Sequence, residues 1–332
     1  MMLRAADNPY RRARVMVFGA SGFIGRWVAQ ALSACGARLY LPVRDPLAAS
    51  ELFHRHGIEG KPIEYDIEHG GSLLQLLQEV RPSIVFHLAG YGVDHGETGE
   101  QPAWRINAGF TGELARAVAG ARDPHWPAQA LVHAGSALEY GAIDGDLAED
   151  SEPNPTTTYG RSKLEGTRQI GQCCKETGFA AVTARLFTVY GAGEHAGRLL
   201  PSLIEASHTD GVVPLTSGVQ QRDFTYVENV AEGLLRLGLV PAETGSHTVV
   251  NLATGRLTPV RQFVETAAGL LSIPSIRLGF GLVPTRFTEM KHSAVNLHRL
   301  ERLLAWRPET SIEEGIRQTL LLLKHPQMER VQ

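Results

Sequence analysis

Tyr159 and Lys163 lie four positions apart in a segment with helical character, so we expect both side chains on one face of a helix. A phenol can exchange a proton with an oxygen atom of a bound molecule when its pKa, normally about 10, falls toward neutrality. A fall to about 7 corresponds to about 4 kcal/mol, which a nearby Lys163 ammonium can supply in a partly desolvated pocket. Ser136, earlier in the chain, can orient and polarise the oxygen that gains charge. The three side chains together predict proton transfer at an oxygen atom.

A glycine-rich turn follows an apolar run at residues 15–18 and precedes a helical pattern at residues 23–33. Such a turn lets the backbone approach a pyrophosphate, whose charge then lies at the helix N-terminus. Glycine turns are common, and this one gains weight from its place at the head of a strand–helix–strand pattern. It predicts a dinucleotide cofactor that exchanges a hydride while Tyr159 moves the proton. The candidate contacts are Gly19, Ser21, Gly22, Phe23, Ile24 and Gly25.

The type of dinucleotide depends on the residues after the second strand. Arg44 follows that strand and offers a planar fork that matches a ribose 2′-phosphate. NADP is therefore favoured, while Asp45 keeps NAD open because a carboxylate can hold a ribose hydroxyl. Asp66 and Ile67 follow the third strand and are candidate contacts for the adenine, although Asp66 could equally serve the turn.

These residues need a scaffold, and strand-like runs alternate with helical segments along the chain. This alternation predicts an α/β fold with a doubly wound parallel sheet of the Rossmann type. Its carboxyl edge would bring Ser136 and Tyr159 together. We expect strands at 15–18, 39–43, 62–65, 84–88, 130–134 and 181–186, and helices at 23–33, 72–79, 108–118 and 159–175.

The pattern becomes shorter and less regular after residue 190. We therefore expect a dinucleotide-binding domain with the catalytic residues at 14–190. A smaller C-terminal α/β lobe at 191–332 would bind the substrate, and part of it could cross back to the sheet.

The sequence resembles the extended short-chain dehydrogenase/reductase family, more particularly its NAD-dependent epimerase/dehydratase branch. The resemblance implies that Ser136, Tyr159 and Lys163 are catalytic, and that Tyr159 and Lys163 also contact the cofactor. It further implies that Leu88, Ala89, Gly90 and Asn107 line the cofactor, with Asn107 supporting the hydrogen-bond network. Besides the glycine turn, the matching segments are His87-Leu88-Ala89-Gly90, Asn107, Gly135-Ser136, residues 159–163, Arg185-Leu186-Phe187, Tyr190-Gly191, residues 221–227 and Trp306-Arg307-Pro308.

The resemblance also implies a nucleotide-diphosphate sugar as the substrate. The family places the Arg of an Arg-Asp-aromatic segment on the diphosphate, which implies that role for Arg222. An Arg fork pairs well with pyrophosphate oxygens. Arg198 and Arg286 are weaker candidates for the same end of the substrate, since each could be a surface ion-pair residue. Thr188 stands where many relatives have Asn in contact with the substrate, which leaves the identity of the sugar open.

The residues after Ser136 bear on the type of reaction. Relatives that dehydrate nucleotide sugars carry acidic residues there, but this chain has Ala137 and Leu138, which cannot transfer a proton. Glu139 should point to the other side of the strand end. The remaining reactions are reduction by NADPH of a nucleotide-linked 4-keto-6-deoxysugar and 4-epimerisation with a retained cofactor. The segment at residues 135–141 is similar to that of sugar ketoreductases, and with Arg44 it favours the reductase.

Two other functions stay open. Some relatives that have lost the Tyr are NADP-binding regulators without enzymatic activity, and the intact Tyr159 argues against that role. A reductase of a small ketone without a nucleotide is suggested by Val43-Arg44-Asp45-Pro46, which is similar to a segment of flavonoid-type reductases.

Composition excludes several classes of protein. With 43% hydrophobic residues, 20% charged residues and a net charge of -3, the chain fits a globular enzyme and lacks a basic field for nucleic acid or anionic lipid. No apolar run approaches the roughly 20 residues of a membrane span. The odd cysteine count and the absence of metal-ligand spacing predict free thiols, no metal and a cytoplasmic location. By family resemblance we expect a homodimer.

Overall fold

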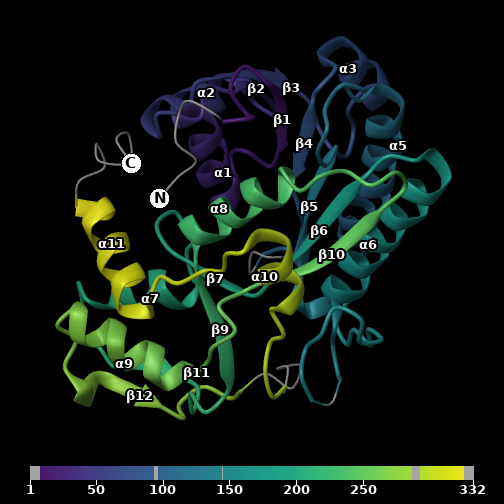
Figure 1. The fold of residues 1–332 in the computed structure, drawn as a ribbon. Coiled ribbons are helices and arrows are strands. Elements are labelled where there is room, and N and C mark those ends of the chain that lie inside the picture. Colours follow the sequence, from purple (N-terminus) through teal and green to yellow (C-terminus); the bar gives the residue numbers. More distant parts are fainter. Residues whose placement is uncertain (1–7, 93–95, 144, 286–291, 325–332) are drawn as a thin grey trace.

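The computed structural model describes residues 8–92, 96–143, 145–285 and 292–324. Its centre is a seven-stranded sheet with the order β10-β6-β5-β4-β1-β2-β3, and every neighbouring pair is parallel (Figure 1). The central strands are buried along almost their whole length, as expected for a parallel sheet covered on both faces. The strands are β1 (Arg14–Phe18), β2 (Arg38–Val43), β3 (Gly60–Glu64), β4 (Ile84–His87), β5 (Leu131–Ser136), β6 (Ala181–Leu186) and β10 (His247–Leu252).

Helices cover both faces of this sheet (Figure 1). Successive residues of β1 alternate between two hydrophobic clusters, with Val15 and Val17 in one and Met16 and Phe18 in the other. Helices α1 (Phe23–Ala34), α2 (Pro46–Arg55) and α8 (Val227–Gly238) contribute to the first cluster. Helices α3 (Leu73–Val80), α5 (Thr111–Ala121) and α6 (Thr158–Thr177) contribute to the second.

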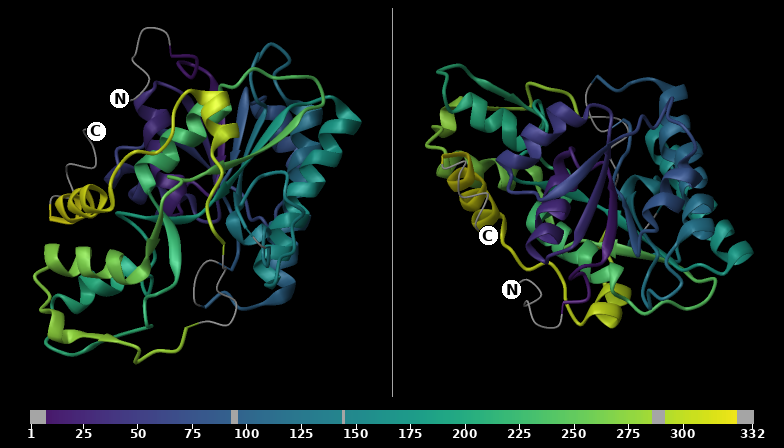
Figure 2. Two further views of the ribbon diagram at one scale, coloured as in Figure 1. Left: turned by 60° about the horizontal axis from the view of Figure 1, so that its bottom comes forward. Right: turned by 90° about the horizontal axis from the view of Figure 1, so that it is seen from above.

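A second group of elements forms a lobe beside the sheet (Figure 2, left, green to yellow). Its strands form two small sheets, ordered β11-β9-β7 and β12-β8. The strands are β7 (Thr188–Tyr190), β8 (Val213–Leu215), β9 (Gln221–Tyr226), β11 (Leu257–Pro259) and β12 (Leu278–Phe280). The helices are α7 (Leu199–Ala206), α9 (Val260–Leu270) and α11 (Ile312–Lys324), while α10 (His298–Leu304) packs near β10 and α8.

The predicted fold class, a doubly wound parallel sheet with a smaller lobe, is confirmed. The expected division at residue 190 does not separate the two sheet systems, because β10 pairs with β6 and α8 packs against α1. The chain therefore leaves the large sheet after β6, builds part of the lobe and crosses back.

One helix begins later than expected. Helix α4 (Glu100–Trp104) runs into a π-helical turn at Arg105–Phe110, so α5 starts at Thr111 and not at 108. In this turn the Thr111 hydroxyl donates to the Asn107 carbonyl at 2.9 Å. Gly166 of α6 packs directly on that carbonyl, since a Cβ at Gly166 would lie 2.2 Å from it. The π-helical turn thus allows the Asn107 carbonyl to pack closely against α6. Sequence periodicity does not reveal this contact.

Candidate active site

Ser136 is the last residue of β5 and begins a 3-10 turn at Ala137–Glu139. Its Oγ accepts a hydrogen bond from the Leu138 amide at 3.2 Å, and its own amide donates to the Glu139 carboxylate at 2.8 Å. Ser136 is buried. These reciprocal bonds fix the hydroxyl at the carboxyl edge of the sheet, where ligands bind in this class of fold.

Tyr159 lies in the first turn of α6, close to Ser136. Thr157 caps this helix by accepting a hydrogen bond from the Gly160 amide at 3.0 Å. Gly160 lets the helix approach the turn after β5, because a Cβ there would lie 2.3 Å from the Leu138 carbonyl oxygen. The result is that Ser136 lies close enough to Tyr159 to lower the pKa of the phenol.

The electrostatics of Tyr159 differ from the sequence expectation. Desolvation by burial raises the pKa of Tyr159 to about 12, and the charges of Glu139 and Glu97 act in the same direction. The Ser136 side chain and the charge of Arg198 oppose this rise but do not overcome it. The protein's own groups therefore keep the phenol protonated at neutral pH, which suits a proton donor.

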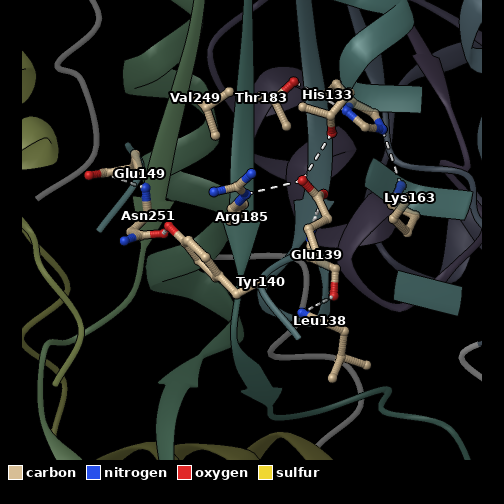
Figure 3. A network of polar contacts seen from close by, with 12 residues as sticks. His133, Leu138, Glu139, Tyr140, Glu149, Lys163, Thr183, Arg185, Val249 and Asn251 are labelled. Carbon is tan, nitrogen blue, oxygen red and sulfur yellow. Dashed lines mark hydrogen bonds and ion pairs between the residues drawn. The ribbon is translucent and has the colours of Figure 1, made fainter. Parts of the chain in front are cut away.

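Lys163 is buried on the same helix, and its Nζ lies 3.1 Å from Nε2 of His133 (Figure 3). Burial lowers the pKa of Lys163 to about 8, although the charge of Glu139 raises it. Sequence reasoning did not find His133, because a histidine inside a buried strand is usually a core residue. The sequence carries no local spacing that links position 133 to Lys163.

Glu139 points into a buried ion pair, in agreement with the expectation that it would not serve as an elimination base. Its Oε2 accepts hydrogen bonds from Nε of Arg185 at 3.1 Å and from the Thr167 hydroxyl at 3.2 Å. The Arg185 guanidinium lies over the Tyr140 ring, 4.2 Å from its centroid. The Tyr140 hydroxyl in turn donates to Asn251 of β10 at 2.7 Å (Figure 3). This network ties the turn after Ser136 to two strands.

The glycine turn has the geometry of a phosphate-binding loop. Gly19 has a φ of +83°, and a Cβ there would lie 2.6 Å from the Ala89 amide nitrogen. At Gly25 a Cβ would lie 1.9 Å from the Gly19 carbonyl oxygen. Gly22 caps α1 without a side-chain hydrogen bond, so amides of the first helical turn, which includes Phe23 and Ile24, can face an anion. The turn adjoins Leu88, whose amide donates to the Phe18 carbonyl.

The residues expected at the adenosine end lie after β2 and β3. Arg44 is exposed, and its charge contributes to lowering the pKa of Asp66, although the main cause is the hydrogen bond from the Glu68 amide. Asp45 caps α2 by accepting hydrogen bonds from the amides of Leu47 and Ala48. Both bonds go to Oδ1 of Asp45. The Ile67 carbonyl accepts a 3.4 Å hydrogen bond from Arg105.

Asn107 holds two elements of the site together. Its Nδ2 donates to the Tyr91 carbonyl at 2.8 Å and to the Ser162 hydroxyl at 3.0 Å. Its Oδ1 accepts from the Tyr91 amide at 2.9 Å. The buried amide thus links the loop after β4, which contains Ala89 and Gly90, to the helix of Tyr159 and Lys163.

The candidate substrate residues lie in the lobe. Arg222 is partly exposed on β9, while the next residue, Asp223, is buried and accepts hydrogen bonds from the amides of Thr254 and Arg256. Neighbouring residues of a strand face opposite sides. Because Asp223 faces the loop that contains Thr254 and Arg256, Arg222 faces away from that loop. Arg198 precedes α7 and lies 3.5 Å from Glu194. Arg286 lies outside the described residues.

Within the described ranges, neither a metal site nor a membrane-spanning helix is found. Between residues 8 and 324, leaving out the three undescribed gaps, no group of His, Cys, Asp or Glu is arranged to hold a metal ion. Among the helices of the described part of the chain, none is long and apolar enough to cross a bilayer.

Comparisons with known proteins identify the family of this chain. A sequence profile of the NAD dependent epimerase/dehydratase family matches residues 15–253. The chain is 28% identical over 325 residues to dTDP-6-deoxy-L-talose 4-dehydrogenase (NAD(P)(+)) from Kitasatospora kifunensis, covering 92% of this chain and 94% of the relative. It is 26% identical over 338 residues to a probable UDP-glucuronate 4-epimerase from Rhizobium meliloti, covering 91% and 94%.

Solved structures give the same picture. MoeE5 in complex with UDP-glucuronic acid and NAD superposes with a TM-score of 0.79 at 26% identity, covering 94% of this chain and 99% of that one. The resemblance inferred from the sequence is confirmed by these matches.

Proposed function

Because the chain belongs to the NAD dependent epimerase/dehydratase family, we propose that it reduces a nucleotide-diphosphate-linked 4-keto-6-deoxysugar with NADPH. The observation that carries this proposal is the half-buried Tyr159 next to Ser136 at the carboxyl edge of the sheet, with a pKa raised by desolvation. Reduction of a ketone needs a proton donor from the start, whereas oxidation of an alcohol needs a base. The similarity to a 4-dehydrogenase of a deoxysugar supports the same reaction type.

Bound NADPH would supply the hydride for the carbonyl carbon. Tyr159 then donates its phenolic proton to the carbonyl oxygen, and the Ser136 hydroxyl polarises that oxygen as negative charge develops. The products are the secondary alcohol and NADP⁺, and the phenolate must regain one proton in each turnover. Lys163 is the buried amine on the same helix that can stabilise the phenolate and return the proton.

Arg44 is proposed to hold the 2′-phosphate of NADPH. It is exposed at the tip of β2, and it neighbours Asp66 closely enough to affect the pKa of that carboxyl. Asp45 caps α2 through Oδ1 alone, so its Oδ2 keeps NAD as the alternative cofactor. Leu88, Ala89 and Gly90 adjoin the glycine turn and would line the rest of the cofactor.

Arg222 is proposed to bind the diphosphate of the substrate, with Arg198 nearer to the sugar. Arg198 affects the pKa of Tyr159, so its charge lies within electrostatic reach of the reacting oxygen. MoeE5, a neighbour of the same fold, binds UDP-glucose and UDP-glucuronic acid. Replacing Arg222 by Ala should weaken binding of a nucleotide sugar and leave NADPH binding unchanged, with Arg317→Ala on α11 as the matched control. Equal turnover in both variants would favour a small ketone substrate.

Epimerisation at carbon 4 is the second candidate, because three of the relatives are named as 4-epimerases. An epimerase oxidises and then reduces the same sugar, so it needs no net supply of NADPH. Elimination of water has less support, because Ala137 and Leu138 bear no acid and Glu139 is held by Arg185.

The deciding experiment supplies purified protein with deuterated NADPH and a panel of nucleotide-linked 4-keto-6-deoxysugars. We expect one NADPH oxidised per sugar reduced and one deuterium transferred to the product carbon. Interconversion of two sugars without net NADPH oxidation, by protein that retains a dinucleotide through purification, would contradict the reductase. Binding of NADPH without turnover of any sugar would instead favour a regulator.

The proposal includes a homodimer in a reducing compartment such as the cytoplasm. The three cysteines are free thiols, with Cys173 and Cys174 buried, which is typical of such a compartment. Light scattering of the purified protein tests the dimer.

A further inference from the structure

A chain of hydrogen bonds leads from Lys163 away from the site. Nε2 of His133 lies 3.1 Å from the Lys163 ammonium, and Nδ1 of the same ring lies 3.3 Å from the Thr183 hydroxyl. The Thr183 hydroxyl lies 2.8 Å from Nε2 of His247. Figure 3 shows His133 between Thr183 and Lys163. Three contacts thus connect α6 with β5, β6 and β10.

Strand register explains this alignment. His133 pairs with Thr183, and Thr183 pairs with Val249 of β10. His247 lies two residues before Val249 and therefore presents its side chain on the same face of the sheet. Helix α6 covers this face. It places Lys163 and Gly171, eight residues apart, along one side of the helix.

The end of this series of hydrogen bonds that is farthest from Lys163 reaches the protein surface. His247 is the first residue of β10, an edge strand, and it is partly exposed. It lines a surface pocket of about 300 Å³ together with Ser246 and Arg299. A Cβ at Gly171 would lie 2.9 Å from Nδ1 of His247, so the imidazole packs closely against α6 at this glycine. This end lies at the amino end of the strand, opposite the edge that carries Ser136.

The imidazole and hydroxyl groups in this series of hydrogen bonds have the chemistry of a proton relay. A neutral imidazole can accept a proton on one nitrogen while it releases the proton of the other, and a hydroxyl can do the same. Desolvation by burial lowers the pKa of His133 well below its usual value and that of His247 to about 4, so both rings are neutral at pH 7. His133 also feels the positive charge of Lys163 and the ring of His87, which stacks on it at 5.2 Å. The positive charges of Arg185 and Lys175 also lower the pKa of His247.

We propose that His133, Thr183 and His247 form a proton path that returns one proton from solvent to Lys163, and through it to Tyr159, after each reduction. This inference rests on the proposed function, because net reduction consumes one proton per turnover while an epimerase gives back the proton it takes. In each cycle one proton enters at His247 and one leaves His133 for the Lys163 amine. The three residues are relay residues, since none of them is placed on the substrate.

The first test compares single-turnover and steady-state rates of NADPH oxidation. Thr183→Val keeps the shape of the side chain and removes the hydroxyl in the middle of the path. We expect the first turnover to stay within about twofold, because Tyr159 starts protonated, while the steady-state rate falls by about tenfold. Thr319→Val is the matched control, since that buried hydroxyl donates to Gly315 within α11, and both rates should be unchanged.

Two results would overturn the path. The first is a steady-state rate for Thr183→Val equal to that of the unmodified protein. The second is an equal loss in the first and later turnovers, which is the result for a purely structural Thr183. Gly171→Ala, which crowds Nδ1 of His247, should reproduce the selective loss in steady state.

The second test needs no substrate. Nitrogen-15 NMR of the imidazoles can follow exchange of the His133 ring proton with deuterated solvent. We expect this exchange to slow by about tenfold in Thr183→Val and in His247→Phe, and unchanged exchange would contradict the path. Slowed exchange in a protein that reduces no ketosugar would refute the proposed function and leave the path standing. Turnover of ketosugars together with unchanged exchange of the His133 ring proton in the variants would refute the path and leave the proposed function standing.

Discussion

Two groups, the half-buried Tyr159 and the buried Lys163, define the site at the scale of residues. Burial acts on both in the direction of the neutral form, raising the pKa of the phenol to about 12 and lowering that of the amine to about 8. Glu139 partly offsets the cost of burying the Lys163 ammonium, while Arg185 neutralises Glu139 in turn. Tyr159 therefore stays a neutral phenol at pH 7, which is the form that a proton donor requires.

Arg44 carries the prediction on cofactor choice. Arg44→Ala removes the only side chain after β2 that we assign to the 2′-phosphate, so the KM for NADPH should rise by about tenfold or more. The KM for NADH should change by less than about twofold, because that cofactor has no such phosphate. Steady-state kinetics with both cofactors measures this, and an equal effect on the two would show that Arg44 does not recognise the phosphate.

At the scale of elements, the position of α6 decides whether Tyr159 reaches Ser136. The helix approaches the turn after β5 at Gly160 and the π-helical turn at Gly166, and both contacts are with backbone carbonyls. Thr167 of the same helix holds Glu139. Small residues at these positions therefore set the geometry of the site as directly as the residues that do the chemistry.

Gly166→Ala tests this helix contact. Alanine favours a helix over glycine by about 1 kcal/mol, but here its Cβ would lie 2.2 Å from the Asn107 carbonyl. We expect the free energy of unfolding in urea to fall by about 1–3 kcal/mol. Gly269→Ala in α9, where a Cβ meets no atom within 4 Å, should instead raise it by about 0.5–1 kcal/mol. Equal effects at the two positions would rule out a close contact at Gly166.

Local spacing explains which parts of the site could be predicted. The glycine turn, Ser136, and the pair Tyr159 and Lys163 each follow from residues close in sequence or from a strand end. The path through Thr183 and His247 could not be predicted, because it depends on the register of three strands that are far apart in the chain. A return of the chain to the large sheet was expected, but β10 was not identified as the returning strand, because its partner β6 is far away in the sequence.

At the scale of the whole molecule, buried histidines link stability to pH. His87, His133 and His247 have lowered pKa values, about 3 for His87 and about 4 for His247, and desolvation is the main cause in each case. The unfolded chain binds protons at these positions below about pH 6.5 while the folded protein does not. These three histidines therefore leave the free energy of unfolding at its full value above about pH 6.5 and reduce it as the pH falls.

The expected loss is about 1.4 kcal/mol per pH unit for each histidine between about pH 6 and the folded pKa. His87→Leu should make the decline of the free energy of unfolding between about pH 6 and pH 4 shallower by that amount. His125→Leu at an exposed position is the control and should leave the slope unchanged. Urea unfolding at a series of pH values measures both, and identical slopes would show that His87 is not held neutral.

The central claim is that the Tyr159 phenol donates the proton during hydride transfer, and Tyr159→Phe tests it most directly. We expect NADPH to bind with unchanged affinity in a fluorescence titration, while single-turnover reduction of a nucleotide-linked 4-ketosugar slows by about a thousandfold. Reduction by Tyr159→Phe within about tenfold of the unmodified rate would contradict the account.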